Sequence, residues 1–255
     1  MTAGILIISI VTLITVLTHR RSRFEEKIFK NVPLSDWITS LIFPTLIYIG
    51  WATLVKSILG RPQIPIFPFD DFDILAVTIL FMVYGFVGNG IHFTSKIVWR
   101  YLDARKNPMA YRVNEMFHNK LSHYLSFLNA LFIAFLLPVL EINHPSLYQL
   151  TRQEMLGVVT AGSVFGISGT RSIVMTNEWF GGYNKPLAIV ILMLLGIIIS
   201  IFKTYHLNLA YYPAGLFVII IFASSLATFF IRQIMIFSRL NSKRRLKFLA
   251  RMLSA

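Results

Sequence analysis

Apolar residues form seven long runs along the chain, and short polar segments separate them. The runs cover residues 3–18, 34–57, 74–98, 117–140, 153–174, 186–204 and 211–237. A helix needs roughly 17–25 apolar residues to cross the hydrocarbon core of a bilayer. Only 14% of the 255 residues are charged, whereas a soluble domain carries roughly a quarter. The pattern predicts an all-α polytopic membrane protein whose seven transmembrane helices form a single domain over residues 1–238.

Lysine and arginine are distributed unevenly among the segments that join these runs. If the segment after the first run is cytoplasmic and the sides alternate from there, twenty of the 24 basic residues are cytoplasmic. The four on the outer side are Lys56, Arg61, Arg152 and Lys203. Cytoplasmic loops of membrane proteins carry an excess of Lys and Arg. The asymmetry therefore predicts an outside N-terminus and a cytoplasmic C-terminus, in a bacterial-type inner (cytoplasmic) membrane or its equivalent.

The last segment, residues 239–255, is basic and carries leucines at intervals. It predicts an amphipathic cytoplasmic tail on the anionic leaflet, where each basic residue contributes about 1 kcal/mol of attraction. A basic tail without regular structure is the alternative. The formal charge of +13 does not indicate nucleic acid, because it is divided among membrane-flanking segments. The chain has no cysteine, which excludes disulfides and thiolate metal sites.

Polar residues recur in the sequence NEMFHNKLSHYLSFLN, residues 114–129, which leads into the fourth run. On a regular helix, at 100° per residue, they share one face about 140° wide. These residues are Glu115, His118, Asn119, Ser122, His123, Ser126 and Asn129. Lipid offers such groups no hydrogen-bond partners, so we expect the face to look into the bundle or a wet cavity.

The third run has a matching polar side, with Asn89, His92 and Lys96 at helical spacing. Because this run descends to the cytoplasm and the fourth rises from it, His92 should lie at the depth of His118 and His123. The sequence thus predicts a cytoplasm-facing pocket between the third and fourth helices. Its other predicted members are Asn89, Ser95, Asn119, Ser126 and Asn129.

Three imidazoles with an open fourth position form the ligand set of a catalytic zinc site, which acidifies a bound water. Under this hypothesis His92, His118 and His123 bind zinc, Glu115 transfers protons and Ser122 donates to an oxyanion. The predicted function is a metal-dependent intramembrane hydrolase acting on a lipid-like substrate. One geometric conflict remains, because His118 and His123 point about 140° apart on a regular helix.

Two alternatives fit the same polar face. Its groups can hydrogen-bond one another at an interfacial helix start and have no chemical role. They can also line the path of a proton or small-solute transporter or channel. Both alternatives require no metal.

The predicted seven-span plan, with an outside N-terminus and a cytoplasmic-side cluster of His and Ser, is similar to that of the alkaline ceramidase type of zinc-dependent membrane hydrolase. The resemblance is one of plan alone. The His-x3-His pair of that family's last span is missing, since residues 211–237 contain no His. No residue role is taken from the family.

The fifth run is rich in small residues, including Gly162 and Gly166. Small residues four apart allow close helix packing, so this face is expected to contact another helix. A partner helix of a larger complex is one option, which gives a third functional hypothesis, a non-catalytic subunit. Arg171 follows at the cytoplasmic end of the run, where it is expected to bind a lipid phosphate or to pair with Glu178.

Overall fold

The structure is a computed structural model that describes residues 1–18, 27–30, 32–175, 184–241, 244–245 and 248. The α-helices are α1 (Thr2–Thr18), α3 (Leu34–Trp37), α4 (Phe43–Leu59), α5 (Asp71–Trp99), α6 (Pro108–Met116), α7 (Ser122–Ile142), α8 (Arg152–Met175), α9 (Asn184–Thr204) and α10 (Pro213–Ser238). Two π-helical turns are continuous with their neighbours: η1 (Ile38–Ile42) joins α3 to α4, and η2 (Phe117–Leu121) joins α6 to α7. A short antiparallel hairpin, β1 (Ile28–Phe29) and β2 (Val32–Pro33), precedes α3, and a 3-10 turn, η3 (Leu209–Tyr211), precedes α10.

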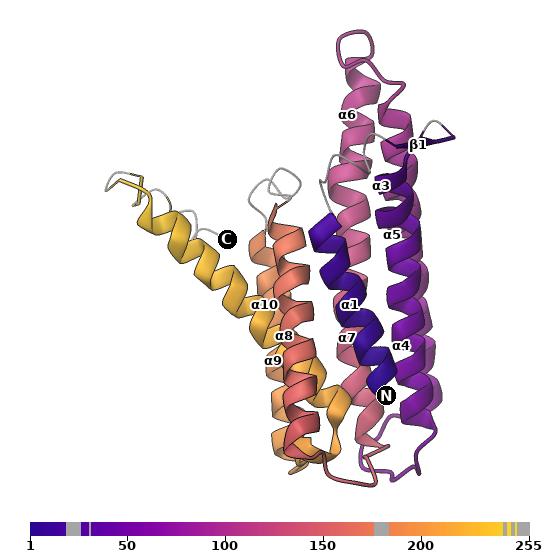
Figure 1. The fold of residues 1–255 in the computed structure, drawn as a ribbon, viewed down its shortest axis with the longest axis vertical. Coiled ribbons are helices and arrows are strands. Elements are labelled where there is room, and N and C mark those ends of the chain that lie inside the picture. The colour runs from indigo at the N-terminus through magenta and orange to yellow at the C-terminus, as the bar shows by residue number, and fades with distance from the viewer. Residues whose placement is uncertain (19–26, 31, 176–183, 242–243, 246–247, 249–255) are drawn as a thin grey trace.

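The long helices run side by side between two ends of the molecule (Figure 1). The connections after α4, α7 and α9 lie at the lower end, while the turn between α5 and α6 lies at the upper end. Within the described residues, five helical segments are long and apolar enough to cross a membrane. They are Leu34–Leu59, Asp71–Trp99, Pro108–Ile142, Pro186–Thr204 and Pro213–Ser238. The prediction of a helical, membrane-embedded protein is thereby confirmed.

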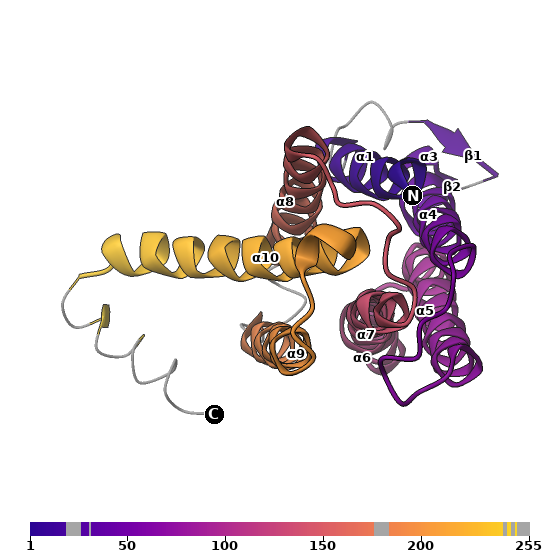
Figure 2. The ribbon, with the colours of Figure 1, turned by 90° about the horizontal axis from the view of Figure 1, so that it is seen from below.

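The first and fifth predicted spans form helices that do not meet these limits. Helix α1 is apolar but short, and α8 carries Gly, Ser and Thr in place of larger apolar side chains. Both nevertheless lie within the bundle, with α1 between α4 and α8 (Figure 2). The count of seven spans and their orientation remain predictions.

Two helix pairs make the most extensive contacts, α5 with α7 and α8 with α10. Gly88 makes the first contact possible, because a Cβ at that position would lie 2.8 Å from the backbone N of Ser126. The upper half of α10 leans away from the other helices (Figure 1). Its side chains there include the exposed Phe230, Ile231 and Ile234. Such an apolar surface suits contact with lipid.

Two glycines of α8, Gly162 and Gly166, pack against α10 of the same chain. A Cβ at Gly166 would lie 2.5 Å from the carbonyl oxygen of Ile221, and one at Gly162 would lie 3.0 Å from that of Phe217. The Gly162/Gly166 face therefore contacts a helix, but α10 covers it. A partner helix of a larger complex at this face stays a prediction.

Buried charged groups connect the loops at the lower end. Arg61 donates to Glu141, whose side chain is fully buried, with 2.9 Å between Nη1 and Oε1. The other Glu141 oxygen accepts from the backbone N of Gly215 at 2.8 Å, in the first turn of α10. His144 Nε2 lies 2.9 Å from an Asp71 carboxylate oxygen. These contacts tie the end of α7 to the start of α10, to the α4–α5 connection and to the start of α5.

Candidate functional site

The π-helical turn η2 changes the direction of the residues that precede α7. A π turn closes an i→i+5 hydrogen bond and so holds one more residue than an α turn, which shifts the helix face by about 100°. His118 and His123, five positions apart, therefore lie on the same side, with ring centroids 5.7 Å apart. Both side chains are buried. The divergence of about 140° between His118 and His123 that a regular helix would impose is therefore absent.

His92 of α5 completes a cluster of three imidazoles. Its ring centroid lies 4.6 Å from that of His118 and 4.6 Å from that of His123. The antiparallel packing of α5 and α7 sets this depth, about seven residues or ~10 Å of helix from the end of α5 at Trp99. The structure thus brings together the three histidines that the sequence placed in one layer.

Hydroxyl and amide groups surround the cluster. The fully buried Ser122 donates to the carbonyl oxygen of His118, and its Oγ lies 3.5 Å from His92 Nδ1. His123 Nδ1 lies 3.3 Å from the carbonyl oxygen of Asn119. One turn further into the bundle, Ser126 Oγ donates to Asn89 Oδ1 at 3.1 Å. Ser122 thus points its proton at the backbone of its own helix.

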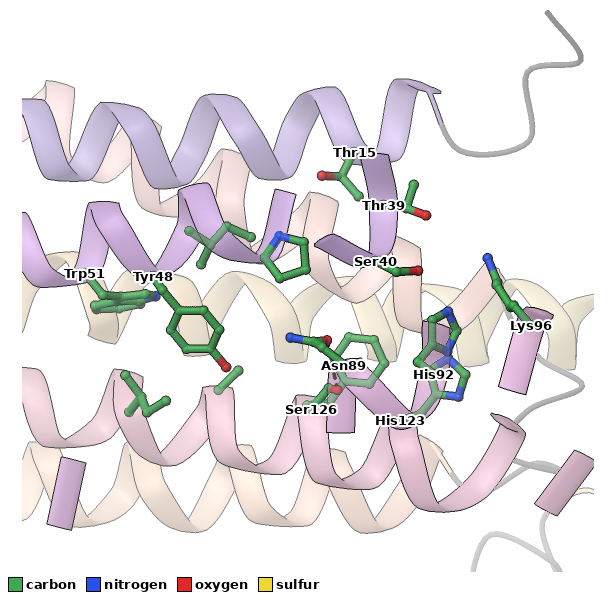
Figure 3. A pocket seen from close by; sticks show the side chains of 15 residues that line it. Thr15, Thr39, Ser40, Tyr48, Trp51, Asn89, His92, Lys96, His123 and Ser126 are labelled. Atoms are coloured by element: carbon green, nitrogen blue, oxygen red, sulfur yellow. Dashed lines mark hydrogen bonds between the residues drawn. The ribbon is translucent and has the colours of Figure 1, made fainter. Parts of the chain in front are cut away.

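A polar pocket of about 210 Å³ lies beside this cluster (Figure 3). Four segments supply its walls: α1, the η1–α4 helix, α5 and α7. Its polar lining residues are Thr15, Thr39, Ser40, Tyr48, Asn89, His92, Lys96, His123 and Ser126. Figure 3 shows Trp51 and Tyr48 at one end, and Ser40, His92, His123 and Lys96 at the other. At about 30 Å³ per water, the pocket can hold several water molecules or a small polar group.

Charge gathers at the Lys96 end of the pocket. Asp36, in α3, accepts from Lys96 Nζ at 2.8 Å and from Arg100 Nη2 at 2.9 Å. Among the described residues, two cations thus pair with one carboxylate, so these three groups together carry one positive charge. This end of the pocket therefore favours binding of an anionic group over a cationic one.

Several predicted site residues lie outside the pocket. Glu115 is exposed and accepts a long hydrogen bond, 3.4 Å from Asn119 Nδ2. The prediction of one continuous polar face from Glu115 to Asn129 is wrong, because η2 breaks the regular helical register between them. Glu115 consequently lines no part of the pocket.

Five more predicted site residues do not line the pocket: Ser95, His118, Asn119, Ser122 and Asn129. Arg171 is predicted to bind a lipid phosphate elsewhere, at the end of the fifth run. Ser95 is buried, and its carbonyl oxygen accepts from Asn114 Nδ2 at 2.9 Å. Asn129 is buried and donates to the carbonyl oxygen of Leu125. Arg171 is exposed near the end of α8, and Glu178, its suggested partner, lies outside the described residues.

The chemistry of the histidine cluster only partly suits a metal. Three imidazoles are a zinc-type donor set. Among the described residues, however, no three His, Cys, Asp or Glu side chains are placed so that they could hold one ion. The side chains as they stand do not fit a zinc site, so no reaction step can be derived through zinc.

The sequence did not indicate a role for Asp36 or for the lining residues Thr15, Thr39, Ser40 and Tyr48. Ser40 lies in η1 and Asp36 in α3, at the start of the second apolar run, and neither was assigned a role. The signal was present in DWITSLIFPT, where polar residues recur within an apolar run. This pattern indicates a helix with some polar positions. It does not indicate that Ser40 forms part of a pocket wall.

No protein-family model, no curated protein and no solved structure matches this chain. Its function must therefore be inferred from its own residues.

Proposed function

We propose that the protein is a seven-span membrane protein, with its N-terminus outside, that binds the polar part of a lipid-like molecule at the histidine cluster. The observation that carries the proposal is the polar pocket itself. His92, His123, Asn89 and Ser126 line a half-open cavity between apolar helices. Buried polar groups are stable when they find hydrogen-bond partners, and a bound polar group adds such partners.

The location of the pocket favours a membrane-borne ligand. On α5, the pocket is lined from Lys96 to Asn89, which is about 10 Å of helix, within a helix long and apolar enough to cross a membrane. A molecule that reaches it from the bilayer needs to bring only its polar end to the histidines. The positive groups around Asp36 lie where the basic-residue asymmetry places the cytoplasmic surface.

The absence of cysteine allows a direct test of the orientation. Single cysteines introduced as Lys106→Cys, after α5, and Gln149→Cys, before α8, lie on exposed positions at opposite ends of the molecule. We expect a membrane-impermeant maleimide to label Gln149→Cys in intact cells and to label Lys106→Cys only after permeabilisation. The cysteine-free parent chain is the control. The reverse pattern would contradict the orientation, and labelling of both from outside would contradict the span count.

Lipid retained by the purified protein tests the binding function. We expect wild-type protein, purified in mild detergent, to retain a lipid-like molecule that mass spectrometry detects. The variant His123→Ala is expected to lose at least about tenfold in affinity, which corresponds to 1.4 kcal/mol. His206→Asn, an exposed histidine at the other end of the molecule, is the control and should retain it. Equal retention by both variants would contradict a role for the pocket.

The zinc-dependent hydrolase is the second candidate function. The observation that favours it is the short distance between the ring centroids of the three imidazoles, 4.6, 4.6 and 5.7 Å. It would require the rings to turn toward a common ion. Metal analysis of the same purified samples decides this point. About one zinc per chain, lost in His123→Ala and kept in His206→Asn, supports the hydrolase. Absence of zinc from the wild type rules out that mechanism and leaves the binding function intact.

A further inference from the structure

A second and larger cavity adjoins the polar pocket. It measures about 630 Å³ and lies among α4, α5 and α7. Its lining is almost wholly apolar and includes Val55, Leu59, Leu75, Met82, Leu136 and Leu140. Trp51 and Ile133 line both cavities. The two cavities are therefore neighbours along α4, α5 and α7, and together they are called the groove below.

The groove changes from polar to apolar along α5. Lys96, His92 and Asn89 line the first cavity, while Met82, Thr78 and Leu75 line the second. Lys96 and Leu75 are separated by about 32 Å of helix at 1.5 Å per residue. This length is close to the roughly 30 Å thickness of a bilayer's hydrocarbon core. A groove of this shape matches a molecule with one polar end and one long apolar chain.

The polar end of the groove contains a hydroxyl group that suits a ligand oxygen. Ser40 is 3% exposed, and among the described residues its Oγ has no hydrogen-bond partner. Figure 3 shows this hydroxyl in the pocket, at the same end as Lys96 and His92. A buried hydroxyl without a partner is unfavourable, so a ligand that accepts its proton would stabilise the site.

The charges at this end indicate the sign of the ligand. Lys96 lines the pocket, and its ammonium group has three N–H donors, one of which pairs with Asp36 at 2.8 Å, so it suits an anionic group. The other end of the groove disfavours an ion. Of the residues that line the second cavity, only Lys56 and Thr78 carry polar side chains beside the indole of Trp51, so away from Lys56 an ion would lose its hydration without replacement.

From these observations we propose that the groove binds an anionic amphipath with a single long hydrocarbon chain. Its carboxylate or phosphate monoester lies between Ser40 and Lys96, and its chain passes Trp51 into the apolar cavity. The proposal rests on the binding function above and specifies its ligand class. It also assigns to Ser40 and Val55 roles in recognising the head group and the chain.

Quenching of tryptophan fluorescence tests the path of the chain, because Trp51 lines both cavities. The probes are a fatty acid brominated in mid-chain, an alkyl phosphate brominated at the same carbon and the matching neutral alcohol, added to the full-length protein in detergent. We expect saturable quenching by an anionic probe and at least about tenfold weaker binding of the alcohol. The fatty acid and the phosphate distinguish a carboxylate from a phosphate head group. In Trp51→Phe most of the saturable quenching should be lost.

Substitutions at the two ends of the groove distinguish recognition of the ligand's head group from recognition of its hydrocarbon chain. Ser40→Ala and Lys96→Met should each weaken binding of the anionic probe by about tenfold, as expected for a hydrogen bond to a charged group. Val55→Phe, which fills the apolar cavity, should weaken binding of the long-chain probe by a similar factor. Binding of a short-chain analogue should be unaffected. The matched control is Val83→Phe, an exposed position on α5 that lines neither cavity. Unchanged melting temperatures show that each variant is folded.

The outcomes distinguish this proposal from the binding function. If the alcohol binds as tightly as the acids, or if Val55→Phe binds the long chain normally, the ligand class is wrong. In that case, retention of a native lipid that depends on His123 still supports the binding function. If no brominated probe gives saturable quenching, the proposed ligand class is overturned as well. Failure of both the probes and native retention overturns both proposals.

Discussion

The variant Arg61→Met is expected to lower the free energy of unfolding by about 3–5 kcal/mol, the usual effect of removing one partner of a buried ion pair. Glu141 is fully buried, and Arg61 Nη1 lies 2.9 Å from its Oε1. Without the guanidinium, the carboxylate keeps only the backbone N–H groups at the start of α10 as partners. The same Nη1 also donates to the carbonyl oxygen of His144 at 2.9 Å, and this bond is lost as well.

Denaturation in mixed micelles measures this change, with Lys203→Met as the control. Lys203 is an exposed basic residue on the same side of the molecule, and its substitution should change the unfolding free energy by less than about 0.5 kcal/mol. The double variant Arg61→Met with Glu141→Gln should recover part of the loss, because the buried charge is removed with its partner. A loss no larger than that of Lys203→Met would show that the pair does not stabilise the fold.

The variant Gly166→Ala is expected to destabilise the protein by about 1–3 kcal/mol, as overpacking does in a well-packed core. The new Cβ would lie 2.5 Å from the backbone oxygen of Ile221 and closer still to Ser224 Oγ. The side chain of Ser224 can turn away, but the backbone of α10 cannot. The two helices must therefore move apart along their contact.

Gly157 in the same helix is a matched control, because a Cβ there would meet no atom within 4 Å. Gly157→Ala should stabilise the protein by roughly 0.5–1 kcal/mol, since alanine loses less backbone entropy than glycine in a helix. Thermal melting of both variants in the same detergent gives the comparison. Equal shifts of the two melting temperatures would contradict the close contact between α8 and α10.

The sequence predicts the helices of this fold well because their apolar runs are long. The run at 74–98 matches α5 (Asp71–Trp99), and the run at 211–237 matches α10 (Pro213–Ser238). The fourth run extends further than predicted, because α6 and η2 precede α7 as one continuous helical segment from Pro108. Polar residues over those first two turns hid this extension from a reading based on hydrophobicity.

The candidate site was predicted in part. Helical spacing and antiparallel order were enough to place His92 near His118 and His123, since both depend only on regular geometry. The position of Glu115 could not be predicted, because a π turn depends on tertiary packing that the local sequence does not reveal. The pairing of Arg61 with Glu141, 80 positions apart, depends likewise on how two loops meet.

The π turn η2 has a consequence for the comparison of related chains. A π turn is equivalent to an α-helix with one inserted residue. In a relative that lacks one residue between Phe117 and Leu121, the helix would be regular, and the residue aligned with His118 would point about 100° away from the cluster. The length of this segment, as much as its histidines, would therefore show which relatives share the site.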